Sequence, residues 1–203
     1  MTQARIRVQQ QRYAEAVQAL DRVLADDPKN QAAWVLRGHA YFLAGNLFDS
    51  EESYIKALRL KPTLKDQTVQ ERLGMVYIRR KAWKDARVVF LKNCKEFTST
   101  TSWTYLGVAL MRLGDLTLAE DALTQASILD NLNPKVWGFI AILCLLVGRD
   151  RKKQAELCYR EAVKIGLHDG AILEEIGDLF VREGSLELAA DAFTTLVKVS
   201  LRR

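Results

Sequence analysis

Small residues and large apolar residues recur along the chain at a nearly constant spacing. Trp103 and Trp137 are 34 residues apart, and Pro28 and Pro62 are separated by the same distance. A period of that length accommodates two helices of about three to four turns each, joined by short turns. The pattern predicts one helical array over residues 1–203 rather than a generic helical bundle, since a bundle would not repeat a motif in register. The expected repeats are at about 1–30, with a truncated or degenerate first helix, then 31–64, 67–98, 100–133, 134–168 and 170–203.

Glycines occupy two fixed places in these repeats. A glycine inside a helix costs roughly 1 kcal/mol relative to alanine, so those in the middle of first helices need a packing reason. We expect close backbone approach to a small residue on the second helix. Glycines of the other set lie where each hairpin turns and can end the first helix. Pro28 and Pro62 close their repeats, and Pro134 fits the first turn of a helix. The mid-helix set is Gly38, Gly74, Gly107 and Gly177, the turn set is Gly45, Gly114, Gly148 and Gly184, and the small residues expected opposite the first set are Ala16, Ala86, Ala119 and Ala189.

These residues and their spacing resemble the tetratricopeptide repeat family over almost the whole chain. The match is weaker in the third repeat, where Asn93 and Cys94 replace the usual small and apolar pair. In the fifth repeat Ala141 replaces the mid-helix glycine, and the segment from Gly148 to Ala155 is two residues longer than expected. The resemblance implies an all-α fold, a right-handed α-solenoid of about five to six hairpins with about eleven helices. It also implies a binding surface rather than an enzyme.

The composition supports a packed helical core. Hydrophobic residues make up 49% of the chain, and only 3 residues are proline. The longest apolar stretch, Val136 to Val147, is too short to span a bilayer, so we expect a buried helix and no membrane partner. No charged-then-apolar leader opens the chain. The lack of a polar capping helix after the last repeat predicts that the chain is part of a larger protein or is covered by a partner.

Candidate catalytic residues are few. His39 and His168 have no neighbour in the sequence of the kind used for base or metal chemistry. The adjacent carboxylates of Glu51-Glu52 and of Glu174-Glu175 point in different directions on a helix. Every glycine is explained by the repeat, so no phosphate-binding loop is indicated. The sequence predicts no enzyme activity, no metal and no cofactor.

The three cysteines predict a reducing compartment. Cys94, Cys144 and Cys158 show no paired metal-ligand spacing and lie in largely apolar helical segments. An odd number of scattered thiols argues against a disulfide framework. We expect small core residues, since free cysteine behaves as a small buried hydrophobe.

The chain carries a net charge of +5. Clustered basic residues can bind nucleic acid, acidic protein or a microtubule lattice, or can simply solvate turns. The tryptophans are accounted for by helix packing, so a stacking platform for single-stranded RNA is unsupported and no nucleic-acid partner is expected. The clusters are Arg5, Arg7 and Arg12; Arg79, Arg80, Lys81, Lys84 and Arg87; and Arg149, Arg151, Lys152 and Lys153.

A partner-binding groove is expected along the first helices, which should line the inner wall of the array. Its centre is expected to be apolar and its ends charged, which suits an amphipathic helix or an extended segment of a protein partner. A missing segment of the same protein could fill it instead. The predicted groove residues are Phe42, Arg79, Val108, Met111, Arg112, Ile142, Leu145, Asp178 and Arg182.

Chaperone adaptors of the repeat family hold a partner's terminal carboxylate with a lysine and an asparagine one turn apart on the first helix. No matching pair here has those residue types, so the resemblance disfavours chaperone tails as partners. The matching pairs are Val35/His39, Glu71/Met75, Thr104/Val108 and Glu174/Asp178.

A second resemblance is to the C-terminal repeat region of a family of cilia- and flagella-associated proteins. It rests on segments 102–109, 112–116 and 119–123, on Asn133, Val136 and Trp137, and on segment 34–42. It implies a non-enzymatic scaffold of the axoneme, in the cilium or flagellum, that docks or assembles motility-related complexes with axonemal protein partners. The alternative is a soluble adaptor or co-chaperone that binds short peptide segments.

Overall fold

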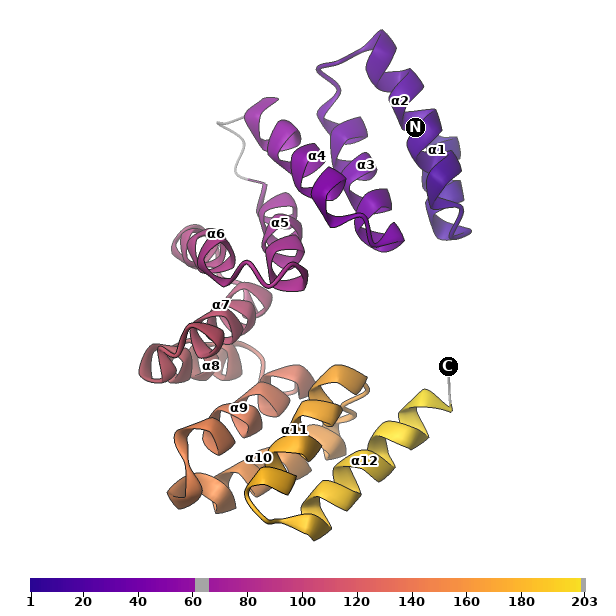
Figure 1. The fold of residues 1–203 in the computed structure, drawn as a ribbon. Coiled ribbons are helices and arrows are strands. Elements are labelled where there is room, and N and C mark those ends of the chain that lie inside the picture. Colours follow the sequence, from indigo (N-terminus) through magenta and orange to yellow (C-terminus); the bar gives the residue numbers. More distant parts are fainter. Residues whose placement is uncertain (61–65, 202–203) are drawn as a thin grey trace. The chain divides into compact units, whose positions relative to one another are not determined.

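The computed structural model describes residues 1–60 and 66–201, so Pro62 and its expected closing role lie outside the described residues, as does the side chain of Arg149. The described residues form twelve α-helices and one short 3-10 helix, with no strand among them (Figure 1). The all-α prediction is therefore confirmed. The helices fall into two compact parts, named here unit 1 (residues 1–98) and unit 2 (residues 99–203). One continuous right-handed array over both units stays a prediction.

Unit 1 consists of three helix hairpins. Each first helix contacts the second helix that follows it, and α2 contacts α3 as α4 contacts α5. The hairpins are α1 (Thr2–Gln9) with α2 (Tyr13–Asp26), α3 (Gln31–Ala44) with α4 (Leu47–Leu60), and α5 (Gln67–Arg79) with α6 (Trp83–Glu96).

Helix α1 was not recognised in the sequence, where about eleven helices were expected. Ala4 packs in a buried cluster with Leu20 of α2, and Val8 packs in a second cluster with Ala16. Only two of its eight residues are buried, so the helix carries almost no apolar periodicity. Contacts with the neighbouring helices therefore stabilise α1 more than its own pattern does.

Unit 2 also consists of three hairpins. The additional residues between Gly148 and Ala155 fall at the 3-10 helix η1 (Arg149–Arg151), which joins the two helices of the middle hairpin. The apolar stretch that was expected to be a buried helix is α9, and eight of its fourteen residues are buried. No helix in the described part of the chain is both long and apolar enough to cross a membrane. The hairpins are α7 (Thr100–Leu113) with α8 (Leu116–Leu129), α9 (Pro134–Val147) with α10 (Lys152–Ile165), and α11 (Gly170–Arg182) with α12 (Leu186–Ser200).

Polar side chains cap four of the first helices. Asn30, Asp66, Ser99 and Asn133 each accept a hydrogen bond from a backbone N–H of the first turn, at 3.0 to 3.1 Å. These bonds satisfy donors that have no partner inside the helix. Pro134 occupies the first turn of α9, as its position in the sequence predicted.

The turn glycines end first helices as expected. All four have positive φ, a region in which a residue with a Cβ is strained. In the two hairpins without a turn glycine, Gln11 and Lys81 adopt the same backbone, with φ of 60° and 58°. The glycines are Gly45 (82°), Gly114 (86°), Gly148 (135°) and Gly184 (73°).

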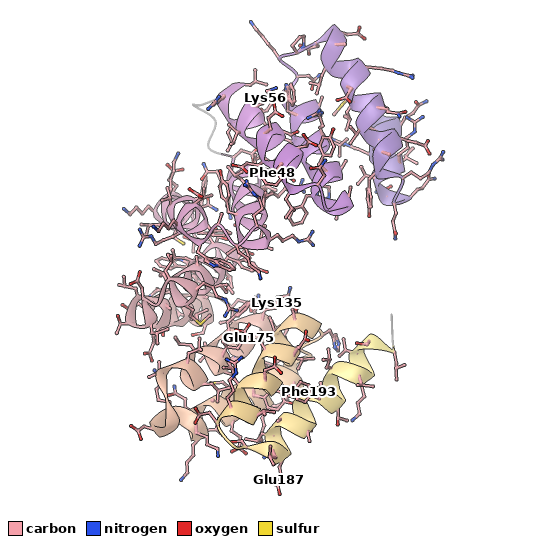
Figure 2. The ribbon with its side chains drawn as sticks, viewed as in Figure 1. Phe48, Lys56, Lys135, Glu175, Glu187 and Phe193 are labelled. Carbon is pink, nitrogen blue, oxygen red and sulfur yellow. The ribbon has the colours of Figure 1, made fainter. Side chains whose placement is uncertain are left out.

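The mid-helix glycines make the expected close approach to the second helix, where the nearest atoms belong to a large side chain and, at Gly107, also to the backbone of Ala119. A Cβ built on Gly74 would lie 2.5 Å from the ring of Phe90, and one on Gly107 would lie 2.7 Å from Leu123. At Gly74, Gly107 and Gly177 this large side chain lies one turn after the expected alanine and fills the space above the glycine. The other two pairs are Gly38 with Tyr54 and Gly177 with Phe193, the latter labelled in Figure 2.

Replacing Gly74 by alanine should destabilise the chain by about 1–3 kcal/mol, because the new methyl group overlaps the Phe90 ring. The double variant Gly74→Ala/Phe90→Leu should be more stable than the sum of the two single variants, because leucine vacates the space that the methyl needs. Urea unfolding followed by circular dichroism measures all four proteins. Strictly additive losses would contradict the proposed contact.

Replacing Lys81 by glycine should stabilise the chain by about 0.5–1 kcal/mol, because glycine adopts a positive φ without the strain of a Cβ. The greater conformational entropy of glycine in the unfolded chain offsets part of this gain. The matched control is Lys92→Gly at an exposed position inside α6, which should lose about 1 kcal/mol. Thermal melting compares the two variants. A loss of stability at both positions would show that the turn backbone is not strained.

Candidate protein-binding surfaces

The apolar centre of the predicted groove is buried. The exposed fraction is 4% for Val108, 5% for Met111, 0% for Ile142 and 5% for Leu145. The expectation that these four side chains form an exposed binding strip is therefore wrong. The physical reason is clearest at α9, which contacts α7, α8, α10 and α11 and so is covered on the side expected to face a partner.

The charged predicted residues of unit 2 come together in a shallow hollow of about 390 Å³. Arg112, Asp178 and Arg182 all line it, together with Glu175. Arg112 donates two hydrogen bonds of 2.6 Å to the two carboxylate oxygens of Glu175, which is labelled in Figure 2. Arg112, a predicted groove residue, thus has a carboxylate partner within the chain.

Phe42 and Arg79, the predicted groove residues of unit 1, contact each other. The Arg79 guanidinium lies 4.1 Å from the centre of the Phe42 ring and donates a 3.1 Å hydrogen bond to the Phe42 carbonyl. The adjacent Arg80 forms an ion pair with Glu51 and lies over the ring of Phe48. Part of the basic cluster at 79–87 is therefore engaged in contacts within unit 1.

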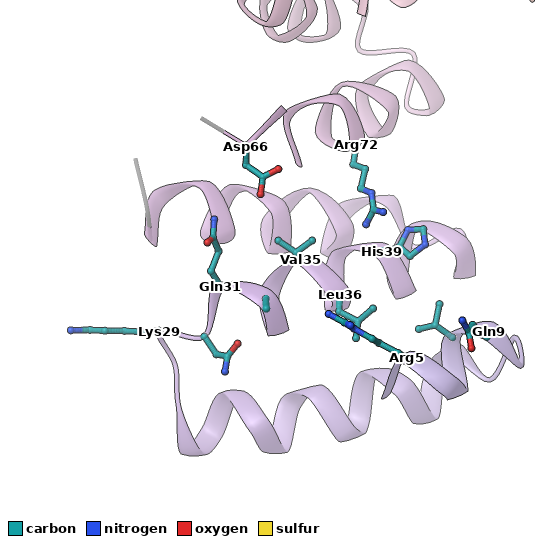
Figure 3. A pocket seen from close by; sticks show the side chains of 12 residues that line it. Arg5, Gln9, Lys29, Gln31, Val35, Leu36, His39, Asp66 and Arg72 are labelled. Atoms are coloured by element: carbon teal, nitrogen blue, oxygen red, sulfur yellow. The ribbon is translucent and has the colours of Figure 1, made fainter. Parts of the chain in front are cut away.

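A hollow in unit 1 was not predicted as a site. It has a volume of about 760 Å³ and is lined by the first helices α1, α3 and α5 and by the α2–α3 loop (Figure 3). We name it the α1–α3–α5 cavity. Arg72 extends from α5 toward His39 of α3, and Arg5 enters the lining from α1. Its lining residues are Arg5, Val8, Gln9, Lys29, Asn30, Gln31, Ala32, Val35, Leu36, His39, Asp66 and Arg72.

Positive charge dominates this lining. Arg5, Lys29 and Arg72 have no carboxylate partner among residues 1–60 and 66–201. The single acidic lining residue, Asp66, accepts a hydrogen bond from the Val69 backbone N–H and so caps α5. The cavity can therefore attract negative charge.

Two polar atoms next to the cavity lack partners. Gln31 Nε2 and His39 Nδ1 are buried and make no hydrogen bond within the described part of the chain. Burial, followed by the charge of Arg72, lowers the pKa of His39 below its ordinary value. The imidazole is therefore predominantly neutral at pH 7. Sequence reasoning had placed Val35 and His39 on the inner wall, but it could not place Arg5 beside them without α1.

The cysteines lie in helices, as expected. Cys144 of α9 and Cys158 of α10 are buried and joined by a side-chain hydrogen bond, although they are 14 residues apart in the sequence. That bond and burial raise the pKa of Cys158. Burial, with the charge of Glu71, raises the pKa of Cys94 to about 12. Among the described residues no group of three or more His, Cys, Asp and Glu side chains is placed to hold a metal ion.

The chain is similar to known proteins over most of its length. Residues 9–200 match the family model described as "Cilia and flagella-associated protein 70 C-terminal domain". The chain belongs to this family. The human "Cilia- and flagella-associated protein 70" is 34% identical over 177 residues, which cover 87% of this chain and 16% of that relative. The chain thus spans about a sixth of the relative's length, and both resemblances found in the sequence are confirmed.

Solved structures confirm the fold. The chain resembles PilW, a "widely conserved type IV pilus biogenesis factor", with a TM-score of 0.76 and 20% identity over 96% of this chain and 89% of that one. It also resembles YrrB, "a TPR protein with an unusual peptide-binding site", with a TM-score of 0.60 and 16% identity over 90% and 93%. The fold is that of a tetratricopeptide repeat solenoid.

Below pH 6.5, unfolding should become easier because of His39. Its lowered pKa in the folded state means that the unfolded chain binds more protons in this window, so stability falls as the pH falls toward the folded pKa. From pH 7 to pH 5 the unfolding free energy of the wild type should therefore fall by more than that of His39→Gln. His168→Gln, at an exposed loop residue, controls for the loss of an imidazole. A pH-independent difference for His39→Gln would contradict the assignment.

Proposed function

We propose that this chain is a non-enzymatic scaffold of the ciliary or flagellar axoneme that docks or assembles motility-related complexes. Membership of the family supports the ciliary setting, and the repeat fold supports binding of protein partners. Because the chain spans 16% of the human relative, the activity of the whole protein belongs to the proposal as well.

The observation that carries the proposal is the α1–α3–α5 cavity. It is an open hollow formed by first helices, lined by aliphatic and cationic side chains rather than by a catalytic set. We place the docking of a partner segment there, in unit 1. The buried residues Val108, Met111, Ile142 and Leu145 are too inaccessible to serve as its anchors. The charged hollow around Asp178 and Arg182 stays a second proposed contact.

Binding through this cavity can be tested by filling it. Ala32 is an exposed alanine of α3 that lines the cavity, whereas Ala44 is an exposed alanine of the same helix outside it. Ala32→Trp should reduce capture of axonemal proteins by the immobilised chain at least about tenfold, because the indole occupies the volume that the partner needs. Ala44→Trp should capture as the wild type does, and circular dichroism should show equal helicity for both.

The source of the captured protein distinguishes an axonemal scaffold from a soluble adaptor that binds short peptides. A salt extract of demembranated axonemes should supply the partner, and the soluble ciliary matrix should not. Capture from the axonemal extract that is unchanged by Ala32→Trp would place docking elsewhere. No capture from axonemes, with binding only to short isolated peptides, would favour the soluble adaptor and end the axonemal proposal.

A further inference from the structure

The α1–α3–α5 cavity combines features that together select a class of ligand. Val8, Val35 and Leu36 contribute aliphatic side chains to its lining, while Arg5, Lys29 and Arg72 contribute cations. In Figure 3, Arg72 of α5 and Arg5 of α1 come from opposite sides, with the α3 side chains between them, whereas the Lys29 side chain points away. A ligand that matches this arrangement has an apolar group at its centre and negative charge on either side.

We infer that the cavity binds an acidic, amphipathic segment of a partner protein, in which carboxylate side chains flank an apolar side chain. The apolar group would pack on Val35 and Leu36, and the carboxylates would pair with Arg5 and Arg72. This inference rests on the proposed function, in that the cavity is the docking site, and it adds the chemistry of the docked segment.

Charge complementarity carries the inference. None of the three cations has a carboxylate partner in residues 1–60 and 66–201. The one acidic lining residue, Asp66, uses one of its two carboxylate oxygens to cap α5. Cations that share a hollow repel one another, and an added carboxylate relieves that repulsion while it gains charge-assisted hydrogen bonds. An arginine can hold a carboxylate with two parallel bonds, as Arg112 holds Glu175 in unit 2.

The types of side chain that line the cavity favour a peptide over a nucleic acid as its ligand. No Phe, Tyr or Trp side chain is among the lining residues of the cavity. Binding of single-stranded nucleic acid relies mainly on stacking of bases on such rings. Aliphatic side chains offer packing for leucine, isoleucine or methionine instead. Gln31 Nε2 and His39 Nδ1, buried without partners, are further groups that a bound segment could satisfy after small side-chain rotations.

The first test is a selection with a phage-displayed library of random dodecapeptides. The library is selected on the wild-type chain, and binders that also bind Ala32→Trp are removed. The expected outcome is enrichment of peptides in which Asp or Glu flank a leucine, isoleucine or methionine. Enrichment of sequences without acidic residues, or no enrichment over Ala32→Trp, would overturn the inference.

The second test measures how the affinity for the leading selected peptide depends on charge. Binding of the peptide to each variant is followed by fluorescence anisotropy. Arg5→Gln and Arg72→Gln should each weaken binding about fivefold or more, and Arg5→Lys should restore most of the loss. Arg22→Gln is the matched control, because Arg22 is exposed on α2 outside the cavity and loses the same charge. The peptide with every Asp and Glu replaced by Asn and Gln should bind at least about tenfold more weakly.

Each outcome separates the inference from the proposed function. If the neutral peptide bound as tightly as the acidic one, or if Arg5→Gln and Arg22→Gln weakened binding equally, the inference of an acidic segment would be overturned. Docking at the cavity would still be supported by axonemal capture that is lost in Ala32→Trp. A dodecauridylate that binds as tightly as the peptide, and weakens with Arg5→Gln, would overturn it in favour of a phosphate backbone. Acidic binding at the cavity without axonemal capture would support the inference and refute the axonemal proposal.

Discussion

The contact between a mid-helix glycine and one large side chain of the following helix sets the geometry of four hairpins. At Gly74 the ring of Phe90 occupies the place where a Cβ would stand, and Phe90 is fully buried. The first helix therefore approaches its partner with no side chain of its own at the contact, and the ring of Phe90 fills the space between them. That approach leaves the opposite side of each first helix to be covered by neighbouring helices or left open, and the binding surfaces depend on which of the two occurs.

Features that depend on near neighbours in the sequence could be predicted. Turn glycines such as Gly114, the proline at the start of α9 and the glycine positions within a hairpin are local, since each requires a particular backbone or a partner within about one repeat. Helix α1 could not be predicted, because only Ala4 and Val8 of its residues are buried and their partners lie on α2 and α3. Tertiary contacts, rather than periodicity, stabilise that helix.

The candidate site was harder to predict for the same reason. Helical spacing gives the direction of Ile142 and Leu145 on α9, but not whether another helix covers that direction, and in unit 2 it does. Arg112 lines the charged hollow of unit 2, yet its partner Glu175 is 63 residues away in the sequence. Pairing over that separation depends on how α7 and α11 are brought together, which no local pattern encodes.

The cations of the cavity differ from other arginines of the chain in their ion pairing. Arg37 pairs with Asp21, and Arg151 with Glu120, so the chain supplies carboxylates where arginines meet other helices. Exposed Arg22 simply faces water. Arg5 is exposed as Arg22 is, but it shares a hollow with Arg72, a neutral histidine and one carboxylate, that of Asp66, and no ion pair joins either arginine to it in the described part of the chain. Such a local imbalance opposes folding slightly, and proteins retain such features most often where a ligand corrects them.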